Sequence, residues 1–120
     1  MKKKIYLLII LLAILTGLLV FNYINKQEKA ENEIILFYSI QCPHCKELED
    51  FLHDNNIHAK INFVEKEVSQ DKANVKELIK IMQKCNIPKR NYIEIPFLWT
   101  GHECLIGSDD IIKFFTEATK

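Results

Sequence analysis

The sequence carries no excess of charge of either sign, since its 16 Lys and Arg residues balance its 16 Asp and Glu residues. Residues 26–120 carry 13 basic against 16 acidic residues, which does not resemble the basic footprint of a nucleic-acid-binding protein, and we expect no nucleic-acid partner. It also lacks a second C-x-x-C pair and any H-x-x-x-H spacing, which argues against the usual four-coordinate structural zinc site. Repeats and low-complexity stretches are absent too, and 120 residues allow only one small domain beside a targeting segment.

One long apolar run is present, at the N-terminus. Three lysines at positions 2–4 are followed by an apolar stretch, residues 5–21, that only two residues interrupt. About twenty helical residues span the roughly 30 Å of bilayer hydrocarbon, so we predict a transmembrane helix within residues 1–25. Neither a small-x-small cleavage site nor a lipoprotein-type cysteine follows, which favours an uncleaved signal anchor over a cleaved signal peptide. The lack of an amphipathic face argues against a buried core helix.

The charge around this run predicts its orientation. Lysines before the span, by the positive-inside tendency, keep the N-terminus in the cytoplasm and place the rest outside it, in the periplasm or at the cell surface. Residues 26–33 are polar and indicate a short tether, and residues 34–120 form the exported domain. A compartment outside the cytoplasm permits disulfides, and the four cysteines of the domain, an even number, suit that setting.

Two of these cysteines form the motif Cys42-Pro43-His44-Cys45, the strongest functional signal in the chain. An apolar, β-rich run at 34–38 precedes it, and a helical pattern of apolar residues follows. Pro43 suits the first turn of that helix, because the N–H that it lacks would be unpaired there in any case. The thiols therefore lie where a buried strand passes into a helix N-terminus, whose free N–H groups and dipole stabilise a thiolate. This arrangement predicts thiol–disulfide exchange.

Short apolar strands alternate with amphipathic helices over the rest of the domain. We predict strands at 34–38 and 60–68, helices at 43–55 and from a Ser69 cap to about 85, a hairpin of 97–100 with 103–106, and a last helix capped by 107–110. A parallel crossover followed by a hairpin implies an α/β fold with a mixed four-stranded sheet and helices on both faces, in the order β-α-β-α-β-β-α. The second helix has one predicted apolar face, made of Val75, Leu78, Ile79, Met82 and Cys85.

This order, with C-P-x-C at the first strand-to-helix junction and Ile95-Pro96 before the third strand, resembles the thioredoxin fold in its glutaredoxin-like form. The segment 105–110, Leu-Ile-Gly-Ser-Asp-Asp, is similar to the Gly-Gly-x-Asp-Asp segment with which glutaredoxins hold glutathione. The resemblance implies that Pro96 is cis and that Ile95 and Pro96 dock the extended chain of a substrate. It also implies that glutathione, as a co-substrate, would be held by Gly107, Ser108 and Asp109.

The same resemblance, together with position in the helix, makes Cys42 the attacking thiol and Cys45 the resolving thiol. A protonated His44 would add positive charge near the Cys42 thiolate, and stabilising the reduced form makes the couple more oxidising. The implied substrates are protein thiols and disulfides, and the chemistry needs no metal or organic cofactor. The Cys-Pro-His-Cys motif is similar to that of periplasmic disulfide-introducing oxidoreductases and of the thioredoxin-like domains attached to vitamin K epoxide reductase homologues. The second of these implies a membrane quinone-linked thiol oxidase as a partner.

Two departures from the family pattern bear on mechanism. Ile106 stands in place of the first glycine of the glutathione segment, and its branched side chain would crowd a glutathione backbone. Many thioredoxins carry a buried acid six residues before the first cysteine, whereas this chain has Leu36 there. Proton transfer must then use water, His44 or another carboxylate.

Several alternatives stay open at this point. The domain could be a glutathione-dependent reductase, a metal-delivery module that holds copper on Cys42 and Cys45, an inert structural disulfide, or an interaction module without chemistry. Cys85 and Cys104 are either small core residues or a second disulfide that braces the loop carrying Pro96. A bridge requires their Cα atoms to lie within about 7 Å.

Overall fold

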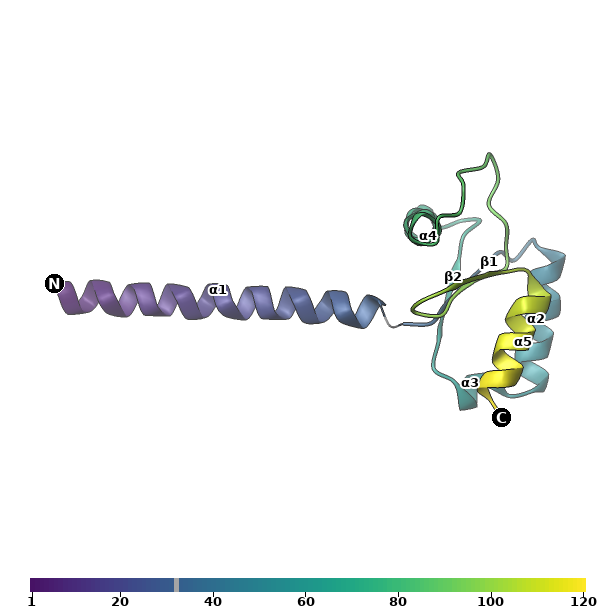
Figure 1. Ribbon diagram of the computed structural model, residues 1–120, viewed down its shortest axis with the longest axis horizontal. Helices are drawn as coiled ribbons and strands as arrows, with labels where there is room; N and C mark the ends of the chain where they lie inside the picture. Colours follow the sequence, from purple (N-terminus) through teal and green to yellow (C-terminus); the bar gives the residue numbers. More distant parts are fainter. Residues whose placement is uncertain (32) are drawn as a thin grey trace. The chain divides into compact units, whose positions relative to one another are not determined.

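The computed structural model describes the backbone of residues 1–31 and 33–120, and the side chains of residues 1–26 and 33–120. The chain divides into two units on either side of position 32. The first unit is a single helix, α1 (Lys2–Glu31), drawn in purple and blue in Figure 1. Its 30 residues correspond to a length of about 45 Å.

Helix α1 contains the predicted membrane span. Its segment Lys2–Lys26 is long and apolar enough to cross a membrane, and none of the span is buried within the protein. The polar side chain of Thr16 is satisfied locally, because its hydroxyl donates to the carbonyl of Leu12 at 3.0 Å. The helix continues through Glu31, so residues 26–31 of the expected tether are helical, and position 32 lies outside the described residues.

The second unit, residues 33–120, has the predicted order of elements with one short helix added. The added helix is α3, which lies between α2 and β2. The elements are β1 (Ile35–Tyr38), α2 (Pro43–Asp54), α3 (Ile57–Lys60), β2 (Val64–Glu67), α4 (Lys72–Lys84), β3 (Phe97–Trp99), β4 (Cys104–Ile106) and α5 (Ser108–Ala118).

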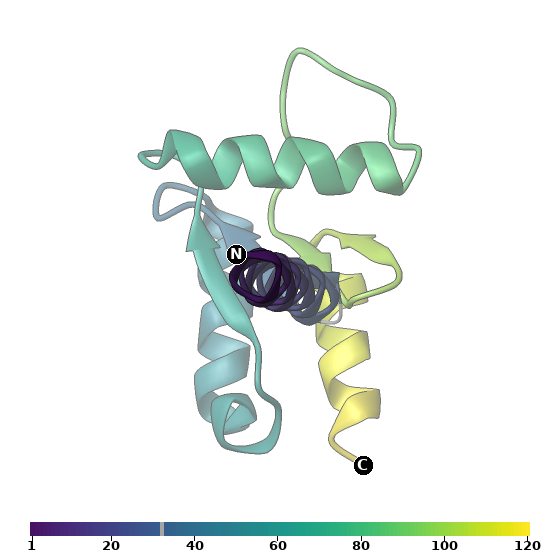
Figure 2. The same cartoon turned by 90° about the vertical axis from the view of Figure 1, so that its left-hand side faces the viewer.

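The four strands form one mixed sheet in the order β2-β1-β3-β4. Strand β1 is parallel to β2 and antiparallel to β3, and β3 forms an antiparallel hairpin with β4. Helix α4 covers one face of this sheet, while α2 and α5 cover the other, as the two views in Figures 1 and 2 show. The predicted α/β fold with helices on both faces is confirmed.

Each face of the sheet has its own apolar core. Because side chains alternate along a strand, Leu36 and Leu98 point toward α2 and α5, where Phe115 is among the residues that pack against them. Phe37 and Phe97 point to the opposite face, toward α4, and their rings meet edge to face with centroids 6.2 Å apart. The first core holds α2, and hence the motif at its N-terminus, against the end of β1.

The start of α4 differs from the prediction. Asp71 rather than Ser69 is the N-cap, and its side chain accepts hydrogen bonds from the N–H groups of Ala73 and Asn74 at 2.8 and 3.2 Å. Ser69 instead bonds the side chain of Glu67 through both its backbone N–H and its hydroxyl. A carboxylate accepts the charge-assisted bonds of a helix N-terminus, which favours Asp71 as the cap.

Two further details of the prediction are wrong. The second strand is shorter than residues 60–68, because Asn56, in the left-handed conformation with φ of 52°, turns the chain after α2. The turn starts α3 and carries Ile57 into the core. On α4 the buried residues are Leu78 and Ile81, whereas Ile79 is exposed and lines a cavity at the edge of the contact with the sheet.

Candidate active site

The Cys-Pro-His-Cys motif lies at the junction of β1 and α2, as predicted. Cys42 is the N-cap of α2, with Pro43 in the first turn, and its backbone N–H bonds the carbonyl of Ser39 at 3.1 Å. Both motif cysteines are free thiols; Cys42 is half-buried and Cys45 is buried. Solvent and a substrate can therefore reach the first sulfur more readily than the second.

The environment of Cys45 holds its thiol in the protonated form. Burial, foremost, raises the pKa of Cys45 from 9.0 to about 12, with smaller contributions from the neighbouring thiol of Cys42. A backbone hydrogen bond from Ser39 works in the opposite direction but does not cancel the effect. The resolving thiol predicted from the sequence thus needs a proton acceptor before it can attack.

A cis peptide bond joins Ile95 to Pro96, in agreement with the family resemblance. The sulfur of Cys42 lies 3.7 Å from the carbonyl oxygen of Ile95, although the two residues are 53 positions apart. Among the described residues, no backbone hydrogen bond uses the N–H or the C=O of Ile95. The backbone of Ile95 therefore offers an N–H donor and a C=O acceptor beside the first thiol, which an extended polypeptide could pair with.

The predicted substrate-binding residues gather around one hollow of about 330 Å³, here called the Gly107 groove. Gly107, with φ of 93°, turns the chain from β4 into α5, and its N–H bonds the carbonyl of Pro96 at 2.9 Å. This bond ties the two predicted binding segments together. The groove is lined by His44, Ile95, Pro96, Ile106, Gly107, Ser108, Asp109 and Asp110.

The side chain of His44 lies in the Gly107 groove and is 75% exposed. Its Nδ1 atom is 3.9 Å from the carboxylate of Glu47, one turn further along α2. His44 does not line the hollow beside Cys45. Its surroundings suit contact with a bound substrate better than proton transfer from the buried thiol.

A second hollow, here called the thiol pocket, adjoins both motif cysteines and has a volume of about 230 Å³. Two carboxylates line it together with Cys45, namely Glu49 on α2 and Glu65 on β2. Tyr38 lines it too, and its pKa is raised by burial first and then by Glu65, Glu67 and Glu49. The pocket thus holds two carboxylates beside the thiols, which the sequence analysis did not identify, and Lys46 is the cation that lines it.

The positions of these two acids explain why they were missed. Glu49 lies four residues after Cys45 on one helix face, a spacing that is visible in the sequence. Glu65 reaches the pocket only because β2 pairs with β1 so that Glu65 lies opposite Leu36. A carboxylate thus stands on the strand next to the position where many thioredoxins carry their buried acid.

Cys85 and Cys104 form a disulfide with their Cα atoms 6.2 Å apart, which decides between the two interpretations of this pair. The bridge joins the end of α4 to β4. The residues between the two cysteines, which include Ile95 and Pro96, therefore form a covalently closed loop. The part of the chain beside the first thiol is thus held at both ends. Within the part of the chain that the structure describes, no three His, Cys, Asp or Glu side chains are grouped to hold a metal ion.

The glutaredoxin family model matches residues 34–98, more than half of the chain. A similar solved structure is the crystal structure of oxidized glutaredoxin 2 from Chlamydomonas reinhardtii, with 18% sequence identity and a TM-score of 0.51. The alignment covers 80% of this chain and 84% of that glutaredoxin chain. The solution structure of the oxidised thioredoxin from Plasmodium falciparum has 17% sequence identity and a TM-score of 0.46. The alignment covers 80% of this chain and 92% of that thioredoxin chain. No curated protein matches the chain significantly.

Proposed function

Because the chain belongs to the glutaredoxin family and is a thiol–disulfide oxidoreductase, we propose that it exchanges disulfides with protein thiols from a membrane anchor, outside the cytoplasm. The observation that carries the proposal is the position of Cys42. Its half-buried sulfur lies at the N-terminus of α2 and 3.7 Å from the carbonyl oxygen of Ile95. A substrate chain that pairs with the backbone N–H and C=O of Ile95 brings its own sulfur to this thiol.

The exchange proceeds in two steps. The thiolate of Cys42 attacks one sulfur of a substrate disulfide, a mixed disulfide forms, and the other substrate sulfur leaves as a thiolate. Cys45 then attacks the sulfur of Cys42, which closes the Cys42–Cys45 disulfide and releases the second substrate thiolate. Two electrons pass from the dithiol to the substrate, and the reverse sequence oxidises a substrate dithiol.

The second step depends on removal of the proton from Cys45, which burial opposes. The thiol pocket supports a route for this proton, because Glu49 and Glu65 line it together with the thiol. A pocket of about 230 Å³ has room for a water molecule that bridges a thiol and a carboxylate. One of these two carboxylates therefore accepts the proton in this chain, where Leu36 replaces the buried acid of many thioredoxins.

The direction of electron flow follows from the couple's reduction potential and from the partner. A membrane quinone-linked thiol oxidase would take two electrons from the reduced dithiol and return it to the disulfide, so that the chain acts as an oxidant of its substrates. A protonated His44, two residues from Cys42, would stabilise the Cys42 thiolate, favour the reduced form and make the couple more oxidising. The resemblance of the Cys-Pro-His-Cys motif supports this direction.

A glutathione-dependent reductase is the second candidate function, and the Gly107 groove favours it. The groove joins the peptide of Ile95 and Pro96 to the N-terminus of α5, where Asp109 and Asp110 lie in the first turn. A helix N-terminus binds a carboxylate, and the two acids attract an ammonium group, so a γ-glutamyl group fits this end. The side chain of Ile106 lines the same groove and takes space there.

The proposal of a membrane anchor depends on α1. Its span Lys2–Lys26 begins with three lysines, and the first acidic residue of the chain is Glu28. This charge distribution supports a cytoplasmic N-terminus and a second unit on the opposite side of the membrane. The anchor would then hold the dithiol close to a membrane-embedded partner.

Redox equilibrium of the full chain in lipid nanodiscs tests the proposed activity. The protein is equilibrated with glutathione buffers, quenched with acid and treated with a thiol-trapping reagent, and the Cys85→Ser/Cys104→Ser variant isolates the motif cysteines. A midpoint well above about −200 mV supports the oxidant, and one near or below about −270 mV indicates a reductase. If Cys42 and Cys45 do not exchange at all, the proposal is wrong and metal binding becomes the better hypothesis.

Placement is tested separately in cells. We expect the chain to stay with the membranes after an alkaline carbonate wash. A membrane-impermeant maleimide should label the reduced motif of intact spheroplasts, with a Cys42→Ser/Cys45→Ser variant as the control. Release of the chain by the wash would argue for a cleaved signal peptide, and labelling only after lysis would place the dithiol in the cytoplasm.

A further inference from the structure

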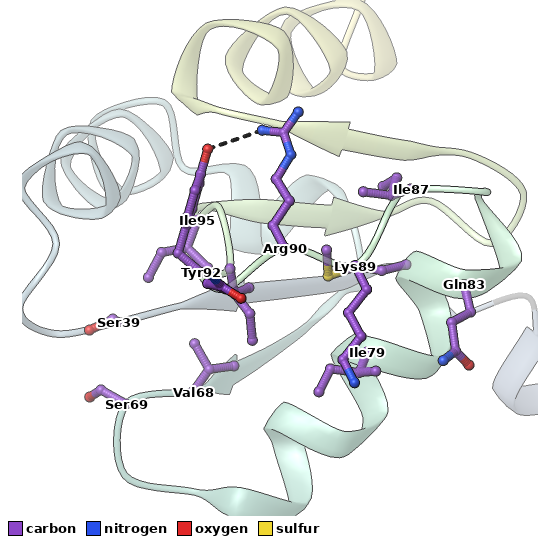
Figure 3. A pocket seen from close by; sticks show the side chains of 13 residues that line it. Ser39, Val68, Ser69, Ile79, Gln83, Ile87, Lys89, Arg90, Tyr92 and Ile95 are labelled. Atoms are coloured by element: carbon purple, nitrogen blue, oxygen red, sulfur yellow. Dashed lines mark hydrogen bonds between the residues drawn. The ribbon is translucent and has the colours of Figure 1, made fainter.

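A cavity of about 480 Å³, here called the α4 groove, lies between α4 and the loop that leads to Ile95, and Figure 3 shows it from close by. Its apolar side chains come from α4, from the loop that leads to Ile95 and from the end of β2. Most of its polar side chains belong to the loop. The groove is lined by Ser39, Val68, Ser69, Ile79, Met82, Gln83, Ile87, Lys89, Arg90, Asn91, Tyr92, Ile93 and Ile95.

Two large side chains in this groove lie at the protein surface rather than in the core. Ile79 on α4 is 36% exposed and Tyr92 on the loop is 60% exposed. Ile79 belongs to the apolar face that the sequence predicts for α4, yet the sheet buries Leu78 and Ile81 instead. An apolar side chain of a partner would remove both exposed surfaces from water.

The α4 groove shares lining residues with the two hollows beside the reactive thiols. Ser39 lines both this groove and the thiol pocket, which contains Cys42. Ile95 lines this groove and also the Gly107 groove, and its carbonyl lies against the sulfur of Cys42. A polypeptide whose cysteine reaches Cys42 and whose backbone pairs with Ile95 therefore has one groove on each side of that cysteine.

An extended chain presents its side chains to such grooves in turn. Successive residues of a strand advance by about 3.3 Å and their side chains alternate between two faces, so the second residue from the cysteine lies about 7 Å away on the same face. Main-chain pairing then supplies affinity and side-chain pockets supply specificity. The residues beside the substrate cysteine, rather than the cysteine itself, would decide which chains bind well.

The charged side chains of the α4 groove are of one sign. None of the described residues that line it is acidic, and its two ionic side chains are Lys89 and Arg90. Arg90 is held in place by Glu94 at 2.7 Å and by the hydroxyl of Tyr92 at 3.2 Å, the latter drawn as a dashed line in Figure 3. Lys89 is exposed at the rim and adds positive charge there. Glu94 already balances the charge of Arg90, so an acidic residue next to the apolar side chain of the partner would complement Lys89.

We propose that the α4 groove binds the substrate polypeptide beside its reactive cysteine, with a large apolar side chain between Ile79 and Tyr92 and an acidic residue near Lys89. The inference rests on the proposed function and names its substrate class. Substrates are extended or unfolded polypeptides with apolar residues near the cysteine. Glutathione has no apolar side chain for this groove and uses the Gly107 groove alone.

Short peptides with a single cysteine test this substrate class. Each cysteine is carried as a mixed disulfide with nitrothiobenzoate, and the reduced full chain in lipid nanodiscs is the electron donor. Cys42 attacks the peptide sulfur and releases the coloured thiolate; Cys45 then attacks Cys42 and releases the peptide thiol. The three peptides place leucine with glutamate, leucine with lysine, or serine with glutamate on both sides of the cysteine. The symmetrical nitrothiobenzoate disulfide, which has no flanking residues, measures the basal exchange.

The wild type should react about tenfold faster with the leucine–glutamate peptide than with the serine–glutamate peptide, since burying part of a leucine side chain yields about that factor. Leucine with lysine should fall between the two. Ile79→Glu, which keeps a good helix former in α4, should reduce the leucine preference to less than about threefold. The matched control is Lys80→Gln, which changes the charge equally at the next position, outside the groove. Partitioning of the peptides into lipid cancels when variants are compared.

Three outcomes would overturn the inference. Equal rates for the three peptides, with the symmetrical disulfide still reduced, would show that the groove does not select substrates. A leucine preference that Ile79→Glu leaves unchanged would place the selection elsewhere. Sedimentation could show a dimer that Ile79→Glu abolishes and Lys80→Gln keeps. This result would mean that a second copy of this chain, and not a substrate, occupies the α4 groove. Failure to reduce the symmetrical disulfide would instead contradict the proposed function.

Discussion

Removing the covalent link between Cys85 and Cys104 should destabilise the second unit by about 3 kcal/mol. The two cysteines are 19 positions apart, and closing a loop of this size lowers the entropy of the unfolded chain by an amount that corresponds to about 3 kcal/mol. Small domains are stable by only about 5–15 kcal/mol, so this single bond supplies a large share of the total.

The link can be broken without changing a side chain. In a Cys42→Ser/Cys45→Ser background, a reductant acts on the Cys85–Cys104 bond alone, so oxidised and reduced samples of one protein can be compared. Urea unfolding of a domain of this size has a slope of about 1 kcal/mol per molar, so the midpoint should fall by about 3 M on reduction. A variant with all four cysteines replaced by serine controls for effects of the reductant.

Trp99 is the natural probe for this experiment. It is the one tryptophan of the chain, it is buried, and it lies directly opposite Cys104 in the pairing of β3 with β4. Its fluorescence therefore reports on the strand that the bond anchors. A midpoint shift below about 0.5 M would refute the reasoning, because the loop would then be ordered as well without the bond as with it.

Further predictions concern the motif, the thiol pocket and the turn before α5. Cys45→Ser should trap the mixed disulfide on Cys42, which mass spectrometry of the intact protein detects, whereas Cys42→Ser should trap none. Since burial raises the pKa of Cys45 from 9.0 to about 12, the reduced fold keeps this stabilisation below about pH 9 and loses it as the pH rises toward 12. The urea midpoint of the reduced protein should therefore fall more over that range than the midpoint of Cys45→Ser. Glu49→Gln/Glu65→Gln should slow release from the mixed disulfide at least tenfold in stopped-flow traces and leave the first attack unchanged, and equal slowing in Asp50→Asn would contradict the proton route. Gly107→Ala should cost about 1–3 kcal/mol in urea unfolding because φ is 93° and ψ is 155° there; a Cβ atom would meet nothing within 4 Å, so a cost near zero would mean that the backbone relaxes freely.

The fold was largely predictable because apolar residues recur along the chain at the spacing that a strand or a helix requires to bury one face. The run 34–38 and the hairpin around Gly101 are recognisable from apolar residues and a turn alone. The start of α4 was not, because Ser69 and Asp71 are both good caps and only the folded chain shows that Glu67 engages the serine. The left-handed Asn56, which creates α3, is a local choice that periodicity does not record.

The active site was predictable to the extent that its residues are neighbours in sequence. The motif, the pair Ile95-Pro96 and the segment from Gly107 onward are each contiguous, and the structure brings the second and third together around one groove. Glu65 was not predictable, because its place beside the thiols depends on the register between β1 and β2. The α4 groove depends on how a loop lies against a helix, which no spacing rule describes.

The sheet also separates the two pairs of cysteines. Cys42 and Cys45 belong to the helix on one face, whereas Cys85 and Cys104 belong to the core on the other, with the fully buried rings of Phe37 and Phe97 in that core. A thiolate must come into direct contact with a disulfide to exchange with it. Scrambling between the pairs would thus require the layers to come apart, so the fold can turn over one dithiol repeatedly while its structural bond stays intact.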